Sequence, residues 1–228
     1  MNHLVVLIGE PVFWAALAVT LFAGFVKGVA GFAMPLVMIS SFSAFLPPEQ
    51  ALAGLILPTL VTNISQATRQ GVGAAWGSVK DYCRFLIATL VMIVISAQFV
   101  TVIPQGLFLL LLGMPITAYA LAQLTGRNLA LRLEHRGRAE WILGAIGGLY
   151  GGVSGVWGPP LIVYLLSVGA DKTETVRVQG VVFFLGALVL LSAHLQTGLM
   201  SGANLWFSAA LVLPAIVGQI FGQRLQDN

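Results

Sequence analysis

The sequence predicts an all-α integral membrane protein made of two inverted-topology repeats, with broken or re-entrant Gly/Pro helices and about seven to nine membrane segments. Composition is the first reason, because 58% of the 228 residues are hydrophobic, only 8% are charged and the mean hydropathy is +0.94. A soluble surface needs far more charge than this. Residues 85–126, 141–170 and 178–223 contain no Asp, Glu, Lys or Arg, and each stretch exceeds the roughly 20 residues of one helical span.

A glycine motif that occurs twice is the second reason. The pattern Gly-x-x-x-Gly-x-x-Gly-x-x-x-Pro begins at Gly24 and begins again at Gly148, 124 residues later. Glycine lets two backbones approach closely and proline removes a backbone donor, so each copy predicts a break in a membrane helix. Interrupted segments in matching positions of two halves point to a transporter binding site. We expect the helix breaks at Gly24, Pro35, Gly148, Gly152 and Pro159.

The first half begins with three apolar segments. Residues 11–28 and 31–46 contain the first copy of the motif, and residues 50–68 follow the turn at Pro47 and Pro48. Two further segments, residues 82–102 and 105–124, form a hairpin that turns at Ile103 and Pro104. The second of these is the extra helix that would invert the following half.

The second half repeats this order after a polar linker from Thr125 to Glu140. Residues 140–151 and 157–169 contain the second copy of the motif. At 1.5 Å per residue each arm covers roughly 18 Å, a little more than half of a 30 Å bilayer core. We therefore expect a re-entrant or sharply broken hairpin here, followed by a spanning hairpin of residues 176–195 and 203–222. The division along the chain is 1–104 for the first half, 105–138 for the connecting helix and linker, and 139–228 for the second half.

Basic residues predict the orientation. They form four clusters: Arg69, Lys80 and Arg84; Arg127, Arg132, Arg136 and Arg138; Lys172 and Arg177; and Arg224. The positive-inside rule places all four clusters, and with them the C-terminus, in the cytoplasm. Pro47 and the loop from Gln196 to Gly202 then face outside. The two motif copies consequently enter the bilayer from opposite sides, which an inverted repeat requires.

Other features exclude classes of protein. Cys83 is the one cysteine, so neither a disulfide framework nor a thiolate metal site is available, and we expect no metal and no cofactor. The segment from Met1 to Pro11 lacks a basic n-region and a cleavage site, so no removable signal peptide is expected. The net charge of +3 comes from arginines in short loops. It reports topology and gives no reason to expect nucleic-acid binding.

With its paired glycine motifs and the polar turns that follow, the chain resembles the sulfite exporter TauE/SafE family of membrane transporters. The resemblance implies export or uptake of a small sulfur-containing or organic anion, such as sulfite or a sulfonate, coupled to H+ or Na+. It implies a multi-pass protein of a bacterial-type inner membrane whose partners are the anion, the coupling ion and the lipid bilayer. It leaves a homo-oligomer open, and it implies that the protein is not an enzyme.

Lys27 is the first candidate for anion binding, because it is the one charged residue between Glu10 and Glu49. An ammonium group at the centre of a membrane helix costs about 2.5–3.5 kcal/mol. The alternative is that its side chain snorkels to the interface. The motif glycines would offer N–H groups at helix starts to an anion, or they are packing positions. These glycines are Gly28, Gly31, Gly152 and Gly155.

Neutral polar side chains form a second group of candidates. Each could donate to an oxyanion or bond a neighbouring helix, and His194 could also titrate near neutral pH. The group comprises Asn63, Ser65, Gln66, Ser154, Trp157, Gln179, His194 and Gln196. Arg69 and Arg177 are interpreted as cytoplasmic anchors.

Two alternative functions belong to other classes. The sequence Gly152-Val-Ser154-Gly155 is similar to the active-site motif of rhomboid-type intramembrane serine proteases, with His194 as the base such a nucleophile needs. The matching glycines of the first half carry Ala30 in place of the serine, which favours a structural reason for them. A membrane scaffold or assembly protein is the other alternative, and it leaves the repeated motif unexplained.

Overall fold

The computed structural model describes residues 9–126, 130–133 and 135–227, and this part of the chain is all helical, without strands. The expectations for residues 1–8, for Arg127 and for Asn228 lie outside the described residues. The helices are α2 (Glu10–Ala30), α3 (Met34–Phe42), α4 (Pro48–Thr68), α5 (Val72–Asp81), α6 (Cys83–Ala97), α7 (Gln105–Leu124), α8 (Arg136–Ser154), α9 (Gly158–Ser167), α10 (Lys172–Gln196) and α11 (Gly202–Asp227).

Among the described residues, four helices are long and apolar enough to cross a membrane: α2, α4, α10 and α11. Helices α6 and α9 are apolar but shorter, and the apolar part of α7 runs from Gly106 to Ala122. In α4 and α10, 67% and 61% of an apolar 18-residue stretch are buried inside the structure. In α2 and in α11 the buried share is 39%. The first pair therefore forms the centre of the bundle, and the second pair lies at its periphery.

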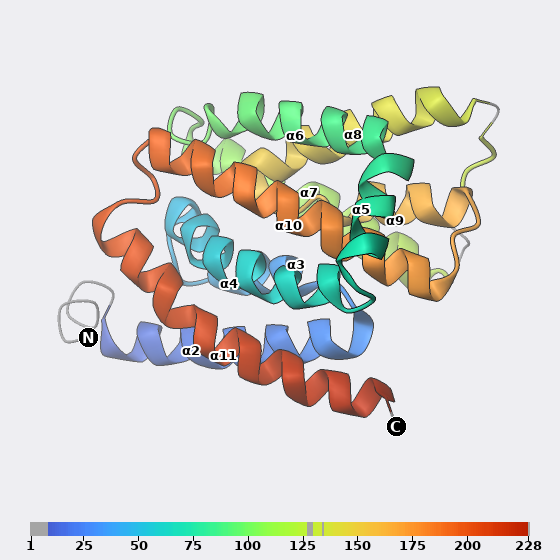
Figure 1. The fold of residues 1–228 in the computed structure, drawn as a ribbon. Helices are drawn as coiled ribbons and strands as arrows, with labels where there is room; N and C mark the ends of the chain where they lie inside the picture. The colour runs from blue at the N-terminus through green and yellow to red at the C-terminus, as the bar shows by residue number, and fades with distance from the viewer. Residues whose placement is uncertain (1–8, 127–129, 134, 228) are drawn as a thin grey trace.

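The helices run roughly along one common direction, so their connections gather at two opposite ends of the molecule (Figure 1). The turn between α4 and α5, the segment that leads into α8 and the C-terminal end of α11 lie at one end. The connections α3–α4, α6–α7 and α10–α11 lie at the other end. This separation agrees with the two groups of loops that the basic residues predict.

Helices from different parts of the chain form the main contacts. Helix α2 packs along α11, α6 packs along α8, and α4 packs against α10. Helix α4 also contacts α11, and α10 contacts α6. The last helix of each half thus packs on the first helix of the other half, and the two central helices pack on each other.

The motif glycines explain how these backbones come so close. A Cβ atom on Gly28 would lie 2.7 Å from Gly222 Cα in α11, and one on Gly152 would lie 2.6 Å from the Ile93 carbonyl oxygen in α6. Gly24 and Gly148 face the backbones of the same two helices. Any side chain at these positions would push the helices apart, so the packing interpretation of these glycines is supported.

Two expectations about elements are wrong. Helix α5 was not expected, because residues 72–81 mix glycine, serine and charged residues rather than an apolar run. Helix α8 has 19 residues rather than the 12 of residues 140–151, so it rises about 28 Å and is no short arm. Its first turn takes up the last residues of the expected polar linker. Helix α9, with 10 residues, is short as expected.

Candidate functional site

Both copies of the motif contain a helix break at the same place. Helix α2 ends at a left-handed residue, Gly31 (φ 79°), and α8 ends at Gly155 (φ 71°). A left-handed C-cap is the conformation that glycine adopts without strain. Each break is three residues long, and a short helix, α3 or α9, follows it.

The observed breaks differ in position from the expected ones. Gly24, Gly148 and Gly152 lie inside continuous helices, because an isolated glycine that packs on a neighbouring backbone does not interrupt a helix. Pro35 and Pro159 lie in the first turns of α3 and α9, where a proline loses no intrahelical hydrogen bond.

The expectation that the motif glycines offer N–H groups at helix starts is also wrong. Gly28 and Gly152 lie within the helices. The N–H groups of Gly31 and Gly155 donate to the carbonyls of Lys27 and Gly151, each at 2.7 Å. The helix starts at the breaks belong to α3 and α9, and neither carries a side-chain cap. Their first-turn N–H groups therefore lack intrahelical partners.

Residues of both breaks line the same cavity. Its volume is about 10 Å³, roughly the room that a single water molecule needs. The lining is mostly apolar, and a larger solute cannot enter without movement of the breaks. The lining residues are Phe32, Ala33, Pro35 and Leu36 from the first break, Gly155, Val156, Trp157 and Gly158 from the second, and Phe183 of α10.

Lys27 lies beside the first break with its side chain in the protein interior. The residue is 2% exposed, so it does not snorkel to an interface. Its Nζ donates to Thr62 Oγ1 at 3.0 Å and to Asn63 Oδ1. Among the described residues no carboxylate pairs with it. It occupies the last turn of α2, where the negative end of the helix dipole favours a cation.

Other polar side chains complete what we call the Lys27 cluster. Gln66 Nε2 donates to the carbonyls of Gly31 at 2.7 Å and Val176 at 3.0 Å, so it ties the first break to α10. Gln219 of α11 donates to the Thr62 carbonyl at 3.3 Å. Among the described residues, Asn63 Nδ2 and Gln66 Oε1 are buried without a hydrogen-bond partner. The cluster comprises Lys27, Thr62, Asn63, Gln66, Gln179 beside Gly31, and Gln219.

The cluster adjoins the start of α3. Thr62 Oγ1 lies 3.9 Å from the sulfur of Met34, which is the first residue of that helix. A partner of the Lys27 ammonium therefore contacts the side chain of the first residue of α3. An ammonium group and a helix N-terminus both favour negative charge.

Sequence reasoning missed Thr62 and Gln219. Threonine is common in membrane helices and gives no signal by itself. Gln219 could have been found from the sequence, because it is an amide inside an otherwise apolar segment. Such a residue faces the bundle interior.

The second half contains a different set of polar groups. His194 is buried, its Nδ1 lies 3.4 Å from Thr197 Oγ1, and its Nε2 has no hydrogen-bond partner among the described residues. The Trp157 indole packs on Gly151 and Gly186. Its Nε1 likewise has no partner in the described part of the chain.

Ser154 gives no support to the protease alternative. Its hydroxyl donates to the Tyr150 carbonyl at 2.7 Å and accepts from the Val156 N–H at 3.0 Å. Within the described ranges no hydrogen bond joins it to His194. A serine nucleophile needs a base within such reach, and here the hydroxyl caps the end of α8.

The remaining candidates lie away from the cluster. Ser65, Arg69 and Gln196 are exposed. Arg177 donates to Ser78 Oγ at 2.9 Å and to Gln70 Oε1 at 2.6 Å, and so joins α10 to α5 and to the turn before it.

Apolar helices of spanning length fit a multi-pass membrane protein, and in the described part of the chain two matched breaks line a small cavity. Residues 16–228 match the family model described as sulfite exporter TauE/SafE. The chain therefore belongs to this family of membrane transporters. No curated protein and no solved structure matches the chain.

Proposed function

We propose that this protein is a secondary transporter that exports a small sulfur-containing or organic anion, such as sulfite or a sulfonate, across the cytoplasmic membrane. The coupling ion in this proposal is H+ or Na+. The observation that carries it is the buried Lys27, whose partners are neutral oxygens rather than a carboxylate. A paired lysine would stabilise the fold without attracting an anion. An unneutralised one leaves a positive site beside the central cavity.

The neighbouring groups suit an oxyanion. Asn63 Nδ2 is a buried donor without a partner among the described residues, and the starts of α3 and α9 supply further N–H groups. Several donors that converge on one charge are the arrangement by which proteins bind sulfonate or sulfite oxygens without a metal. We infer that the anion binds between Lys27 and the two helix starts.

Transport would require movement, since the cavity has room for about one water molecule. The inter-half contacts suit an inverted repeat, because the pairs α2–α11 and α8–α6 are formed by equivalent helices, and α4–α10 lies between them. In such folds one repeat rocks against the other around a central site. In this proposal the basic end of the molecule, with the C-terminus, faces the cytoplasm.

The test removes the charge of Lys27 and keeps the bulk of its side chain. In proteoliposomes, Lys27→Met should lower sulfite or sulfonate transport at least tenfold, equivalent to about 1.4 kcal/mol. Lys27→Arg should restore little, because a planar guanidinium does not replace a compact ammonium in this site.

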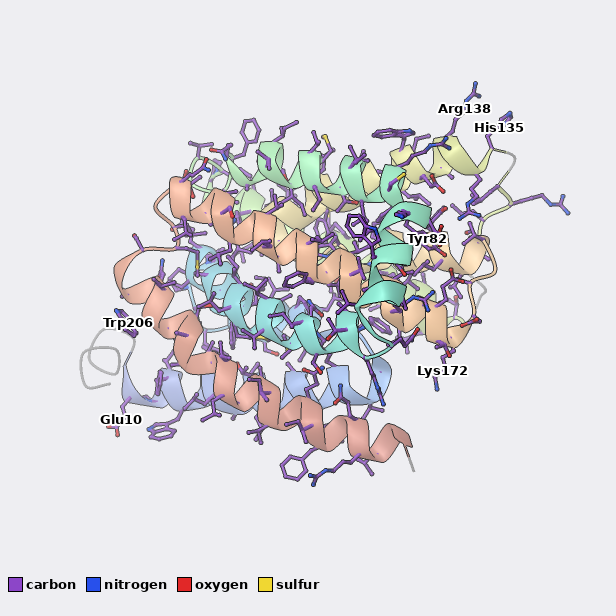
Figure 2. All side chains as sticks on the ribbon, viewed as in Figure 1. Glu10, Tyr82, His135, Arg138, Lys172 and Trp206 are labelled. Carbon is purple, nitrogen blue, oxygen red and sulfur yellow. The ribbon has the colours of Figure 1, made fainter. Side chains whose placement is uncertain are left out.

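Lys172→Met is the matched control, since Lys172 is an exposed residue at the start of α10 (Figure 2). It should transport at the wild-type rate. Unchanged transport by well-folded Lys27→Met would contradict the assignment of the anion site.

A further inference from the structure

A second and much larger polar cavity lies at the end of the molecule that carries the basic loops. Its volume is about 540 Å³. Figure 2 shows Tyr82, one of its residues, at the same end as Lys172, opposite Glu10 and Trp206. The cavity lies where the turn between α5 and α6 meets the starts of α8 and α10. Its lining residues are Lys80, Asp81, Tyr82, Cys83, Arg84, Arg136, Gly137, Glu140 and Glu174.

Two of the three carboxylates in this cavity are already engaged. Glu140 accepts from Tyr164 at 2.6 Å and from Arg136 Nε at 3.2 Å. Glu174 accepts from the Tyr82 hydroxyl at 2.9 Å. Burial raises the pKa of Tyr82, and so does the bond to Glu174, so the phenol remains a donor. Asp81 is the remaining carboxylate.

The arginine side chains that line the cavity have fewer hydrogen-bond partners than these carboxylates. Arg136 donates through Nε alone to Glu140 and Tyr164, and its terminal nitrogens have no hydrogen-bond partner among the described residues. The bond with Tyr164 raises the pKa of Arg136, so its charge persists. Arg84 has no carboxylate within salt-bridge distance in the described part of the chain. The Arg136 guanidinium carbon lies 5.9 Å from the centre of the Tyr82 ring, so this group also has an aromatic contact. The terminal nitrogens of Arg84 and Arg136 remain available as N–H donors from the facing helices α6 and α8.

Gly137, which has no side chain, makes room for the Arg84 guanidinium group. A Cβ atom on this residue would lie 2.7 Å from an Arg84 terminal nitrogen. The Arg84 side chain thus lies directly over the backbone of the first turn of α8. Arg136, the preceding residue, belongs to the same turn.

We propose that this cavity is a second anion site, which captures the transported oxyanion at the cytoplasmic mouth through the terminal nitrogens of Arg84 and Arg136. Guanidinium groups match the geometry of tetrahedral and pyramidal oxyanions and can bind them in a bidentate manner. The lining carries three cationic side chains and three carboxylates, so anion binding here would rest on the directed N–H donors of the two guanidinium groups rather than on a net positive charge. The inference rests on the proposed function for the identity of the anion and for the side that the cavity faces.

Cys83 provides a direct test, because it is the one cysteine of the chain, is exposed and lines the cavity. The purified protein in detergent is labelled with N-ethylmaleimide in sodium sulfate and, at matched ionic strength, in sodium chloride. Sulfate is an unreactive stand-in for the transported anion. At about twice its dissociation constant it should slow labelling about threefold, because only the free protein reacts.

Arg84→Gln should abolish the sulfate protection. Gly137→Ala should weaken it without changing any charge, because the new methyl group displaces the Arg84 side chain. Arg138→Gln is the matched control, since Arg138 projects away from the bundle on the same helix (Figure 2) and should leave protection intact. Each variant is judged by its ratio of rates in the two salts, which removes changes in intrinsic thiol reactivity.

The outcomes separate this inference from the proposed function. Equal labelling rates in sulfate and chloride would overturn the second site, even if Lys27→Met abolished transport. Protection that survives in Arg84→Gln would overturn the assigned residues. Protection that depends on Arg84 and persists in Lys27→Met would support a separate site. It would do so even if proteoliposomes showed no anion transport and the proposed function failed.

Discussion

At the scale of single residues, the partners of Lys27 decide its role. An ammonium group has three donors, and here two of them bond the neutral oxygens of Thr62 and Asn63. Such dipoles reduce the cost of burying the charge but do not cancel it. The sequence pointed to Lys27 because its segment has no other charge. The absence of a carboxylate partner among the described residues is a property of the packed helices.

Asn63→Asp tests whether this missing negative charge matters. The new carboxylate would lie against the Lys27 ammonium and form an internal ion pair that replaces the anion. Transport in proteoliposomes should fall at least tenfold, about 1.4 kcal/mol, while the thermal unfolding midpoint stays at or above that of the wild type. Gln196→Glu, the same change at an exposed position, should leave transport unchanged. Wild-type transport by Asn63→Asp would show that the anion does not need a free charge on Lys27.

At the scale of helices, each glycine of the motif has one of two separate tasks. The first two glycines of each copy lie inside a helix and let a neighbouring backbone approach, as for Gly28 on α11. The third adopts the left-handed conformation that ends the helix. The pattern in the sequence is the same for both tasks, since a glycine shows neither its φ angle nor its neighbour. For this reason the sequence could predict that each motif contains a break, but it could not predict which residues of the motif form the break.

Gly28→Ala and Gly152→Ala should both destabilise the protein. Each methyl group would meet the backbone of the facing helix, which cannot move as the end of a side chain can. Overpacking of this kind costs about 1–3 kcal/mol, so thermal unfolding in detergent should begin several degrees lower. Gly113→Ala in α7 is the control, because no atom lies within 4 Å of its Cβ position. Equal unfolding temperatures for all three variants would contradict the packing role.

At the scale of the whole molecule, the two ends of the bundle differ in charge. The end with the α4–α5 turn, the start of α8 and the end of α11 carries the basic loops (Figure 1). Positive residues of short loops remain in the cytoplasm. The same end contains the proposed capture cavity, which is the arrangement that an exporter would need.

Cysteine labelling tests this orientation. In a Cys83→Ser background, Ser201→Cys should react with a membrane-impermeant maleimide in intact cells, whereas Arg132→Cys should react only after the membrane is opened. The reverse pattern would mean that the proposed capture cavity faces outside, and it would remove the positional argument for export. Reaction of neither variant in opened membranes would indicate a misfolded background, which a transport assay of the Cys83→Ser protein detects beforehand.

Composition and spacing by themselves determined that the chain is helical and membrane-embedded, that two breaks occur in matching places, and that Lys27 is exceptional. These properties follow from local chemistry, because the effects of hydropathy, glycine, proline and an isolated charge do not depend on which helices pack together. Only the tertiary structure decided that Gly31 and Gly155 cap the helices, that Gln219 joins the Lys27 cluster, and that Arg84 and Arg136 face one cavity. The cluster and the cavity depend on which helices become neighbours, since Gln219 lies 157 positions from Thr62 and Arg84 lies 52 positions from Arg136. The caps depend on the φ angles of Gly31 and Gly155, and neither kind of feature leaves a periodic signal in a single sequence.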